Sequence, residues 1–252
     1  MKNISLKLTK YIAISACMIC LSFILNRFLS FSTNWFRIGL SSVPIVFTSL
    51  VLGPIWGGIV GACADLVSAF LMPQGPYFPG YTLDSALLGI LPFITMKLLK
   101  GRNKIQTIGY IFFTCIILVF VSLFCINYSS FKKQELSTAF RITIPFLFLI
   151  YYVVIYFIHL FLYKKQDKFK RIEREDNLYS LSDLYLCTMV NHIVVSLCLL
   201  PCWNLMVANV SFLITSFTSS VVYLVSGIVK PLILYFIINP VIKSRVLNFI
   251  NK

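Results

Sequence analysis

Charged residues are scarce in this chain of 252 residues: they make up 12% of the sequence, and Asp and Glu together number only 8. A soluble domain carries about 25% charged residues. This shortage, in a chain that is 59% hydrophobic, excludes a cytosolic enzyme, a disordered chain and a collagen-like or coiled-coil fibre. We therefore expect a membrane protein with nearly all of its residues inside the bilayer.

The motifs of common catalytic and binding sites are also missing. We find no nucleophile elbow, P-loop, HExxH or GxGxxG. The net charge of +14 does not indicate nucleic-acid binding, because we find no module that reads bases. The pair Cys17 and Cys20 has no second pair or histidine beside it, so helix packing is the better interpretation. His159 and His192 lie in apolar runs and are interpreted as satisfied packing residues. The sequence predicts no enzyme, no metal site and no cofactor.

Apolar runs dominate what is present. A helix needs about 17–25 apolar residues to span a bilayer. The candidate runs are 11–30, 38–52, 54–72, 82–99, 106–127, 142–163, 184–201 and 211–242. The second is short and contains Pro44, and the last is long enough to include a re-entrant or interfacial portion. We predict an all-α fold, a polytopic helical membrane bundle that forms a single domain over residues 1–252.

Lys and Arg are concentrated in alternate connections between these runs. If the N-terminus is inside, the inner segments are 2–10, 97–104, 164–174 and 243–252, and they hold most of the basic residues. The positive-inside rule then predicts that both termini are cytoplasmic. The polar segment 164–176 is expected to be a solvated cytoplasmic loop.

Asp65 stands out within the run 54–72. Three glycines at a spacing of four form one stripe on a helix, which lets another backbone pack closely: Gly53, Gly57 and Gly61. Asp65 continues this stripe, so its carboxylate is predicted to face the bundle. A charged Asp at a helix centre costs at least ~2.5–3.5 kcal/mol. An ion pair with Arg37 or Lys230, or a cavity that holds a ligand, would offset this cost.

The segment 73–81 follows directly. Its three prolines and two glycines argue against a continuous helix, so it is predicted to be a stiff loop at the outer membrane face. Tyr77, Phe78 and Tyr81 then form either an interfacial aromatic belt or a cap whose rings stack on a flat ligand. Asp84 either satisfies the amides at the start of the next helix or contributes to the same site.

The motifs of residues 35–92 occur together in one known family. They are Arg37-Ile38, Pro44-Ile45, Gly53-Pro54, Gly57, Gly61-x-x-x-Asp65 and the stretch Pro76-Tyr77-Phe78-Pro79-Gly80-Tyr81-Thr82-Leu83. In this combination they resemble the folate-family substrate-binding (S) components of energy-coupling-factor (ECF) vitamin transporters. A looser likeness covers Trp203-Asn204 and Lys230-Pro231.

The resemblance implies a plasma-membrane protein that captures folate outside the cell and does not itself hydrolyse ATP. Such proteins dock on a module of two ABC-type ATPases and one transmembrane coupling protein. They usually have six spans, so residues 105–180 are expected to be an inserted pair of spans with the polar loop. The family's first helix contacts the coupling protein through small residues, and the nearest counterparts here are Ala13, Ala16, Cys17 and Cys20.

The resemblance also suggests how a folate would bind. A carboxylate accepts hydrogen bonds from a pterin edge, and Asp65 is the first choice for it, with Asp84 second. The glutamate tail needs cations, and Arg37 is favoured over Lys230. Aromatic walls and amides complete the expected site: Tyr77, Phe78, Tyr81, Trp203, Gln74 and Asn204.

Three other interpretations remain open. The chain could be an S component for another vitamin or pterin. Asp65 and Asp84 could serve an intramembrane aspartyl enzyme, although the flanking sequences do not resemble one. A self-sufficient secondary transporter should show internal repeats, and we find no second copy of the pattern in 37–89.

Overall fold

The computed structural model describes residues 2–32, 37–73, 77–99, 103–132, 143–158, 161 and 179–243, and these are mainly helical. The helices are α1 (Lys2–Phe28), α2 (Ser42–Leu52), α3 (Pro54–Leu71), α4 (Pro79–Leu99), α5 (Asn103–Lys132), the helix Thr143–Ile158, α7 (Leu181–Asn191), the π-helical segment η1 (His192–Leu199), α8 (Leu200–Ala208) and α9 (Phe212–Lys243). Two short strands, β1 (Phe31–Ser32) and β2 (Arg37–Ile38), pair antiparallel.

Within the described residues, six helical segments are long and apolar enough to cross a membrane. They belong to α1, α3, α4, α5, the continuous α7–η1–α8 helix and α9, while α2 and Thr143–Ile158 are shorter apolar helices. Each of the eight predicted runs therefore corresponds to a helix, and the predicted all-α membrane bundle is confirmed.

Several helix boundaries differ from the predicted runs: for example, α1 begins before residue 11 and α8 ends beyond residue 201. The run 38–52 yields a helix only from Ser42, because residues 37–38 pair with β1 instead. Helix α4 begins at Pro79 rather than at residue 82, since proline suits the first turn of a helix. The last run is one helix of 32 residues, without a re-entrant portion, although it contains Pro231 and Pro240.

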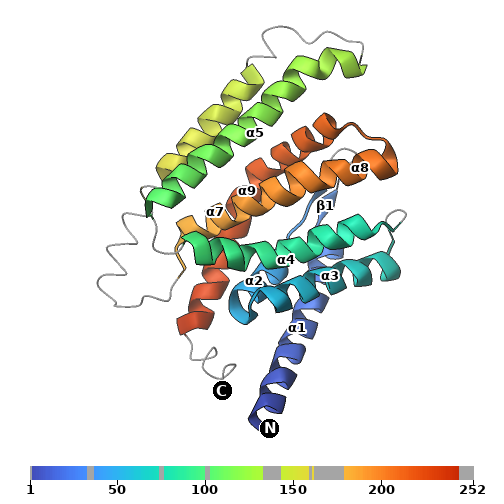
Figure 1. Cartoon of the computed structure of the whole chain (residues 1–252), viewed down its shortest axis with the longest axis vertical. Coiled ribbons are helices and arrows are strands. Elements are labelled where there is room, and N and C mark those ends of the chain that lie inside the picture. Colours follow the sequence, from blue (N-terminus) through green and yellow to red (C-terminus); the bar gives the residue numbers. More distant parts are fainter. Residues whose placement is uncertain are drawn as a thin grey trace.

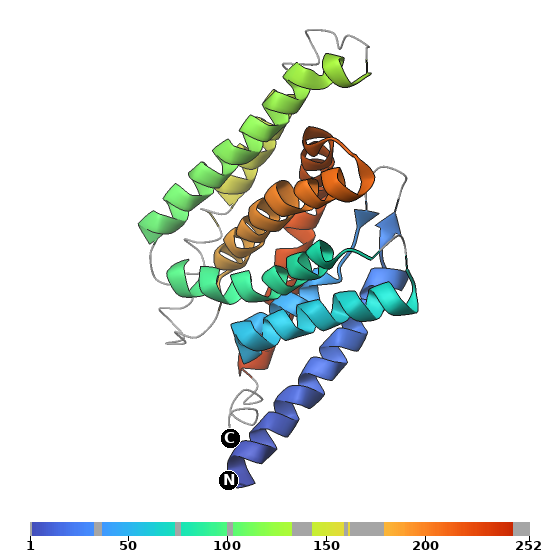
Figure 2. The same cartoon turned by 45° about the vertical axis from the view of Figure 1, so that its right-hand side comes forward.

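The helices form a bundle in which α3 and α4 lie together on one flank (Figure 1). Helix α5 and its neighbour Thr143–Ile158 run side by side on the opposite flank, and α7–η1–α8 and α9 lie between the two pairs. Figure 2 shows that α1 begins and α9 ends at the same end of the molecule, as an even number of spans requires. Which side of the membrane this end faces stays a prediction.

The glycine stripe joins α3 to α4 at very short range. A Cβ added to Gly61 would overlap the carbonyl oxygen of Ser85, and one added to Gly57 would overlap the carbonyl oxygen of Gly89. Gly89 faces Gly57 in return. The predicted close backbone approach is confirmed for Gly57 and Gly61, and it leaves these two helices no room for a ligand between them at this level. Gly53 takes no part in it, because it precedes α3 and a Cβ there would meet nothing within 4 Å.

The helices predicted as an insertion pack on α7 and α9 through an aromatic core. Tyr110 donates a hydrogen bond to the carbonyl of Tyr152 (3.0 Å), and the ring of Phe124 stacks on Phe217 of α9 at 4.1 Å. Tyr151 donates to the carbonyl of Leu224. The hairpin thus braces the helices that carry the candidate site. The polar loop predicted at 164–176 lies outside the described residues, and the status of 105–180 as an insertion stays a prediction.

Candidate binding site

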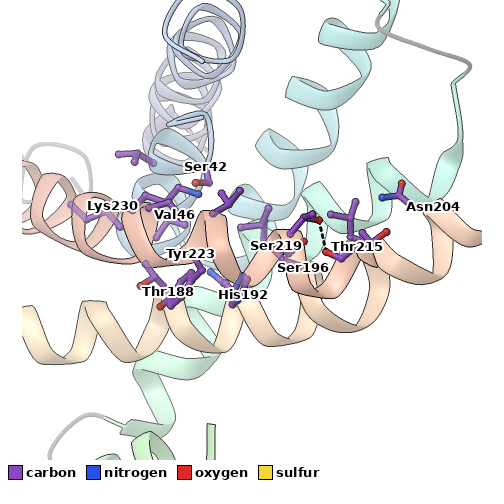
Figure 3. Close-up of a pocket in the computed structure, with 18 residues that line it drawn as sticks. Ser42, Val46, Thr188, His192, Ser196, Asn204, Thr215, Ser219, Tyr223 and Lys230 are labelled. Atoms are coloured by element: carbon purple, nitrogen blue, oxygen red, sulfur yellow. Dashed lines mark hydrogen bonds between the residues drawn. The ribbon is translucent and has the colours of Figure 1, made fainter. Parts of the chain in front are cut away.

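A cavity of about 360 Å³ lies between α2, the α7–η1–α8 helix and α9, and Leu88 of α4 contributes to its wall (Figure 3). Small-molecule sites in proteins usually have volumes of about 300–1,000 Å³. The cavity is elongated in Figure 3: Lys230 lies toward one end, Ser42 and Tyr223 come next on opposite sides, His192 follows, and Asn204 lies at the other end. The bundle therefore contains a hollow large enough for a small ligand.

Polar side chains line the cavity from two facing helices, although both helices are apolar overall. From α9 they come at intervals of one, three or four residues: Thr215, Thr218, Ser219, Tyr223, Ser226 and Lys230. From α7 and η1 they are again one, three or four residues apart: Thr188, Asn191, His192 and Ser196. These intervals place each set on one face of its helix. These lining residues were not predicted from the sequence, because isolated hydroxyls and amides in an apolar helix give no local sign that they border a cavity.

Among the described residues that line the cavity, Lys230 is the one with a charged side chain. The acids of the described chain are Asp65, Asp84 and Asp183, and none of them lines the cavity. Asp183 instead completes a capping box at the start of α7, where its carboxylate accepts from the amide of Ser180 at 3.3 Å. The cavity therefore presents a positive charge without a neighbouring acid in its wall, which suits an anionic ligand.

Asn191 and His192 lie where α7 passes into the π-helical segment. Both side chains line the cavity and are 4% and 7% exposed. Within the described chain, Oδ1 and Nδ2 of Asn191 and Nε2 of His192 have no hydrogen-bond partner. The interpretation of His192 as a satisfied packing histidine is therefore wrong: its ring stacks on Tyr223 at 4.2 Å, but its polar edge is unpaired.

The predicted aromatic residues meet beside the Asn204 end of the cavity. Phe78 packs against Tyr81 and Trp203, with ring centroids 5.9 and 5.6 Å apart. Gly80 permits this, because a Cβ there would overlap the rings of Phe78 and Trp203. Tyr81 donates to Oδ1 of Asn204 at 2.8 Å, and Asn204 lines the cavity. We call Phe78, Tyr81 and Trp203 the aromatic cap.

The two candidate aspartates are bound to other residues. Asp65 accepts a hydrogen bond from the hydroxyl of Thr82 on α4 at 2.7 Å. Asp84 is 5% exposed, and its Oδ1 accepts from Nε1 of Trp203 at 3.0 Å. Asp84 thus holds the aromatic cap and lies beyond the first turn of α4, so it does not cap that helix as one of our interpretations had it. Tyr77 contacts the Thr82 hydroxyl at 3.1 Å.

Of the ten predicted ligand-binding residues, Asn204 and Lys230 line the cavity. Phe78, Tyr81 and Trp203 form the cap beside it. Asp65 does not line the cavity, because the stripe that it continues faces α4. The side chain of Arg37 and all of Gln74 lie outside the described residues, so an Asp65–Arg37 pair stays open.

The predicted partner surface lies on α1. Its four small residues are exposed: Ala13, Ala16, Cys17 and Cys20. Ser15 and Ser22 of the same helix are buried, so the small residues point away from the bundle. Among the described residues, no group of three or more His, Cys, Asp or Glu could hold a metal ion.

Comparisons with known proteins agree with this architecture. The family model described as the ECF transporter substrate-specific component matches residues 10–140, just over half of the chain. The folate transporter FolT of Clostridium novyi (strain NT) is 34% identical over 98 residues, which are 38% of this chain and 57% of that protein. The chain thus matches little more than half the length of this curated relative.

A solved structure shares the fold. The crystal structure of FolT bound with folic acid superimposes with a TM-score of 0.53 at 17% identity, and the match covers 92% of this chain and 96% of that one. The match to the family model and the six membrane-crossing segments identify a multi-pass protein of the cell membrane. The chain belongs to the family of ECF transporter substrate-specific components.

Proposed function

We propose that this S component binds folate with high affinity outside the cell and delivers it through an ATP-driven ECF module. The observation that carries the proposal is the cavity itself: about 360 Å³, lined by hydroxyls and amides, with Lys230 as the charged residue of its lining. Folate is an elongated anion with a flat polar ring, and the sequence likeness to a folate transporter points to the same ligand.

The charge distribution along the cavity supports an orientation for the ligand. Helix α2 begins at Ser42, which lines the cavity toward the Lys230 end. The N-terminus of a helix carries a partial positive charge that adds to that of the lysine. We expect the carboxylates of the glutamate tail at this end, so Lys230 takes the role for which Arg37 was preferred from the sequence.

The aromatic cap supports entry from the side of α8 and the start of α9. This side is away from the end of the molecule where α1 begins (Figure 1). With cytoplasmic termini, the cap faces the exterior, and its rings cover the Asn204 end of the cavity through the Tyr81–Asn204 hydrogen bond. Movement of the cap would then admit the ligand.

Ligand binding is tested with the purified chain in detergent. Mass spectrometry of the protein as isolated, followed by calorimetric titration with folic acid, thiamine, riboflavin and biotin, should reveal a preference for folic acid with a submicromolar Kd. Selective binding of another vitamin would keep the S component and contradict the folate assignment.

Delivery through an ECF module is tested on α1. We expect Ala16→Trp to abolish co-purification with the coupling protein and uptake of labelled folate, because the bulky ring covers the small-residue face. Folic acid binding should stay unchanged. Val119→Trp is the control, since Val119 is 56% exposed on α5 and far along the chain from this face. Equal loss in both variants would contradict docking through α1.

A further inference from the structure

The π-helical segment η1 is an uncommon element in the wall of the cavity. It spans His192–Leu199 and interrupts a helix that is otherwise α-helical on both sides. Segments of this type are rare, and they occur frequently at functional sites. The segment begins beside Asn191 and His192, which line the cavity and are among the residues whose buried polar atoms have no partner in the described chain.

These unpaired atoms are energetically unfavourable in the absence of a ligand. A buried donor or acceptor without a partner costs about 1–3 kcal/mol. Asn191 leaves one donor and one acceptor unpaired, and His192 adds a third polar atom. Since both side chains line the cavity, a molecule inside it can pair all three atoms.

The surroundings of the pair favour a flat, uncharged polar group. The His192 ring lies almost parallel to that of Tyr223, at an interplanar angle of 11°, which fixes the direction of Nε2. Val46, Leu88 and Val222 give the same cavity apolar walls. A carboxamide offers a donor and an acceptor side by side, which matches a ring edge where an N–H lies next to a C=O.

We propose that Asn191 and His192 recognise the heteroaromatic ring of the ligand through hydrogen bonds to its polar edge, while Lys230 binds the anionic tail. This inference rests on the proposed folate function and assigns the two ends of the ligand to different residues. The ring is then recognised by Asn191 and His192, which line the cavity and have polar atoms without a hydrogen-bond partner in the described chain. Asp65, which accepts a hydrogen bond from Thr82, no longer has this role.

The test compares folic acid with p-aminobenzoylglutamate, which has the tail but lacks the pterin ring. Competition against labelled folic acid measures both affinities. Asn191→Leu should weaken folic acid about 10- to 100-fold, because two hydrogen bonds are lost, and leave the tail fragment unchanged. Lys230→Met should weaken both molecules.

Two further measurements separate recognition from a structural role. Without ligand, Asn191→Leu should unfold at the same temperature as the wild type or a higher one, since it removes two unpaired buried atoms. His192→Phe keeps a ring beside Tyr223 and should weaken folic acid only. Asn127→Leu, on α5, is the matched control and should change neither affinity.

The inference is overturned if Asn191→Leu weakens both molecules equally or weakens neither. It is also overturned if the tail fragment fails to compete at millimolar concentration, because the tail would then have no site of its own. If the wild-type chain does not bind folic acid at all, the proposed function fails first, and this outcome differs from selective changes in the variants.

Discussion

Helices α3 and α4 touch backbone to backbone, whereas α7–η1–α8 and α9 are separated in part by a hollow. Gly57, Gly61 and Gly89 remove the side chains that would hold the first pair apart. In the second pair, side chains such as His192 and Lys230 border an open cavity. The same bundle thus contains one interface that excludes a ligand and one that has room for it.

The polar groups of the two pairs differ in whether they border the cavity. Beside α3 and α4, Asp65 is bonded to Thr82 and Oδ1 of Asp84 to Trp203, while Oδ2 of Asp84 is buried without a partner in the described chain and does not line the cavity. In the cavity, Asn191 and His192 have unpaired buried atoms within the described chain. Since burying unpaired polar atoms is costly, and those of Asn191 and His192 are the ones that border the cavity, we propose that a ligand pairs with them.

Among these variants, Lys230→Met should have the largest effect, and it acts on ligand binding between α7–η1–α8 and α9. Removing one partner of a buried charge pair costs about 2–5 kcal/mol, so we expect the Kd for folic acid to rise about 100-fold. Titration calorimetry measures this change. Lys97→Met is the control, because Lys97 is exposed near the end of α4 and should leave the Kd unchanged. A similar Kd in all three proteins would remove Lys230 from the site.

Gly61→Ala should instead destabilise the contact between α3 and α4. Its new methyl group would overlap the carbonyl of Ser85, and the helices must separate to accept it. We expect a loss of about 2–3 kcal/mol in the free energy of unfolding, since a backbone atom cannot move aside as a side chain can. Thermal unfolding in detergent measures it.

Gly109→Ala provides the comparison for that variant. A Cβ at Gly109 on α5 would meet only Phe113, at an ordinary contact distance of 3.8 Å. The unfolding temperature should therefore stay the same or rise, because alanine favours helix more than glycine does. Equal destabilisation by both alanines would contradict a special closeness of α3 and α4.

Trp203→Phe tests how the two pairs are joined, because this residue links α8 to α4. The substitution keeps a ring beside Phe78 but removes the donor to Asp84, leaving a buried carboxylate unpaired. We expect a loss of about 1–2 kcal/mol in the free energy of unfolding. Adding Asp84→Leu should restore most of it, since the unpaired carboxylate is then gone. No recovery in the double variant would contradict this explanation.

The sequence predicted the helices well but the cavity poorly, for a physical reason. Apolar runs and glycine spacing are local properties, so they predicted the bundle and the α3–α4 contact. Serines in a membrane helix are ambiguous, because they can bond to their own backbone: Ser216 and Ser220 donate to carbonyls four residues earlier. Ser219 and Ser226 instead line the cavity, and only the packing of α9 against α7 decides which serines do so.

Asp65→Asn should have the smallest effect, and it separates the sequence-based site from the observed cavity. If Asp65 bound the pterin edge, as we inferred from the sequence, the amide would weaken folic acid strongly. In the structure the carboxylate lies outside the cavity lining and accepts from Thr82, a bond that an amide oxygen can also accept. We therefore expect the Kd to change less than about threefold, which is about 0.6 kcal/mol. A tenfold loss with unchanged thermal stability would return Asp65 to the site and require a cap that opens far enough for the ligand to reach α3.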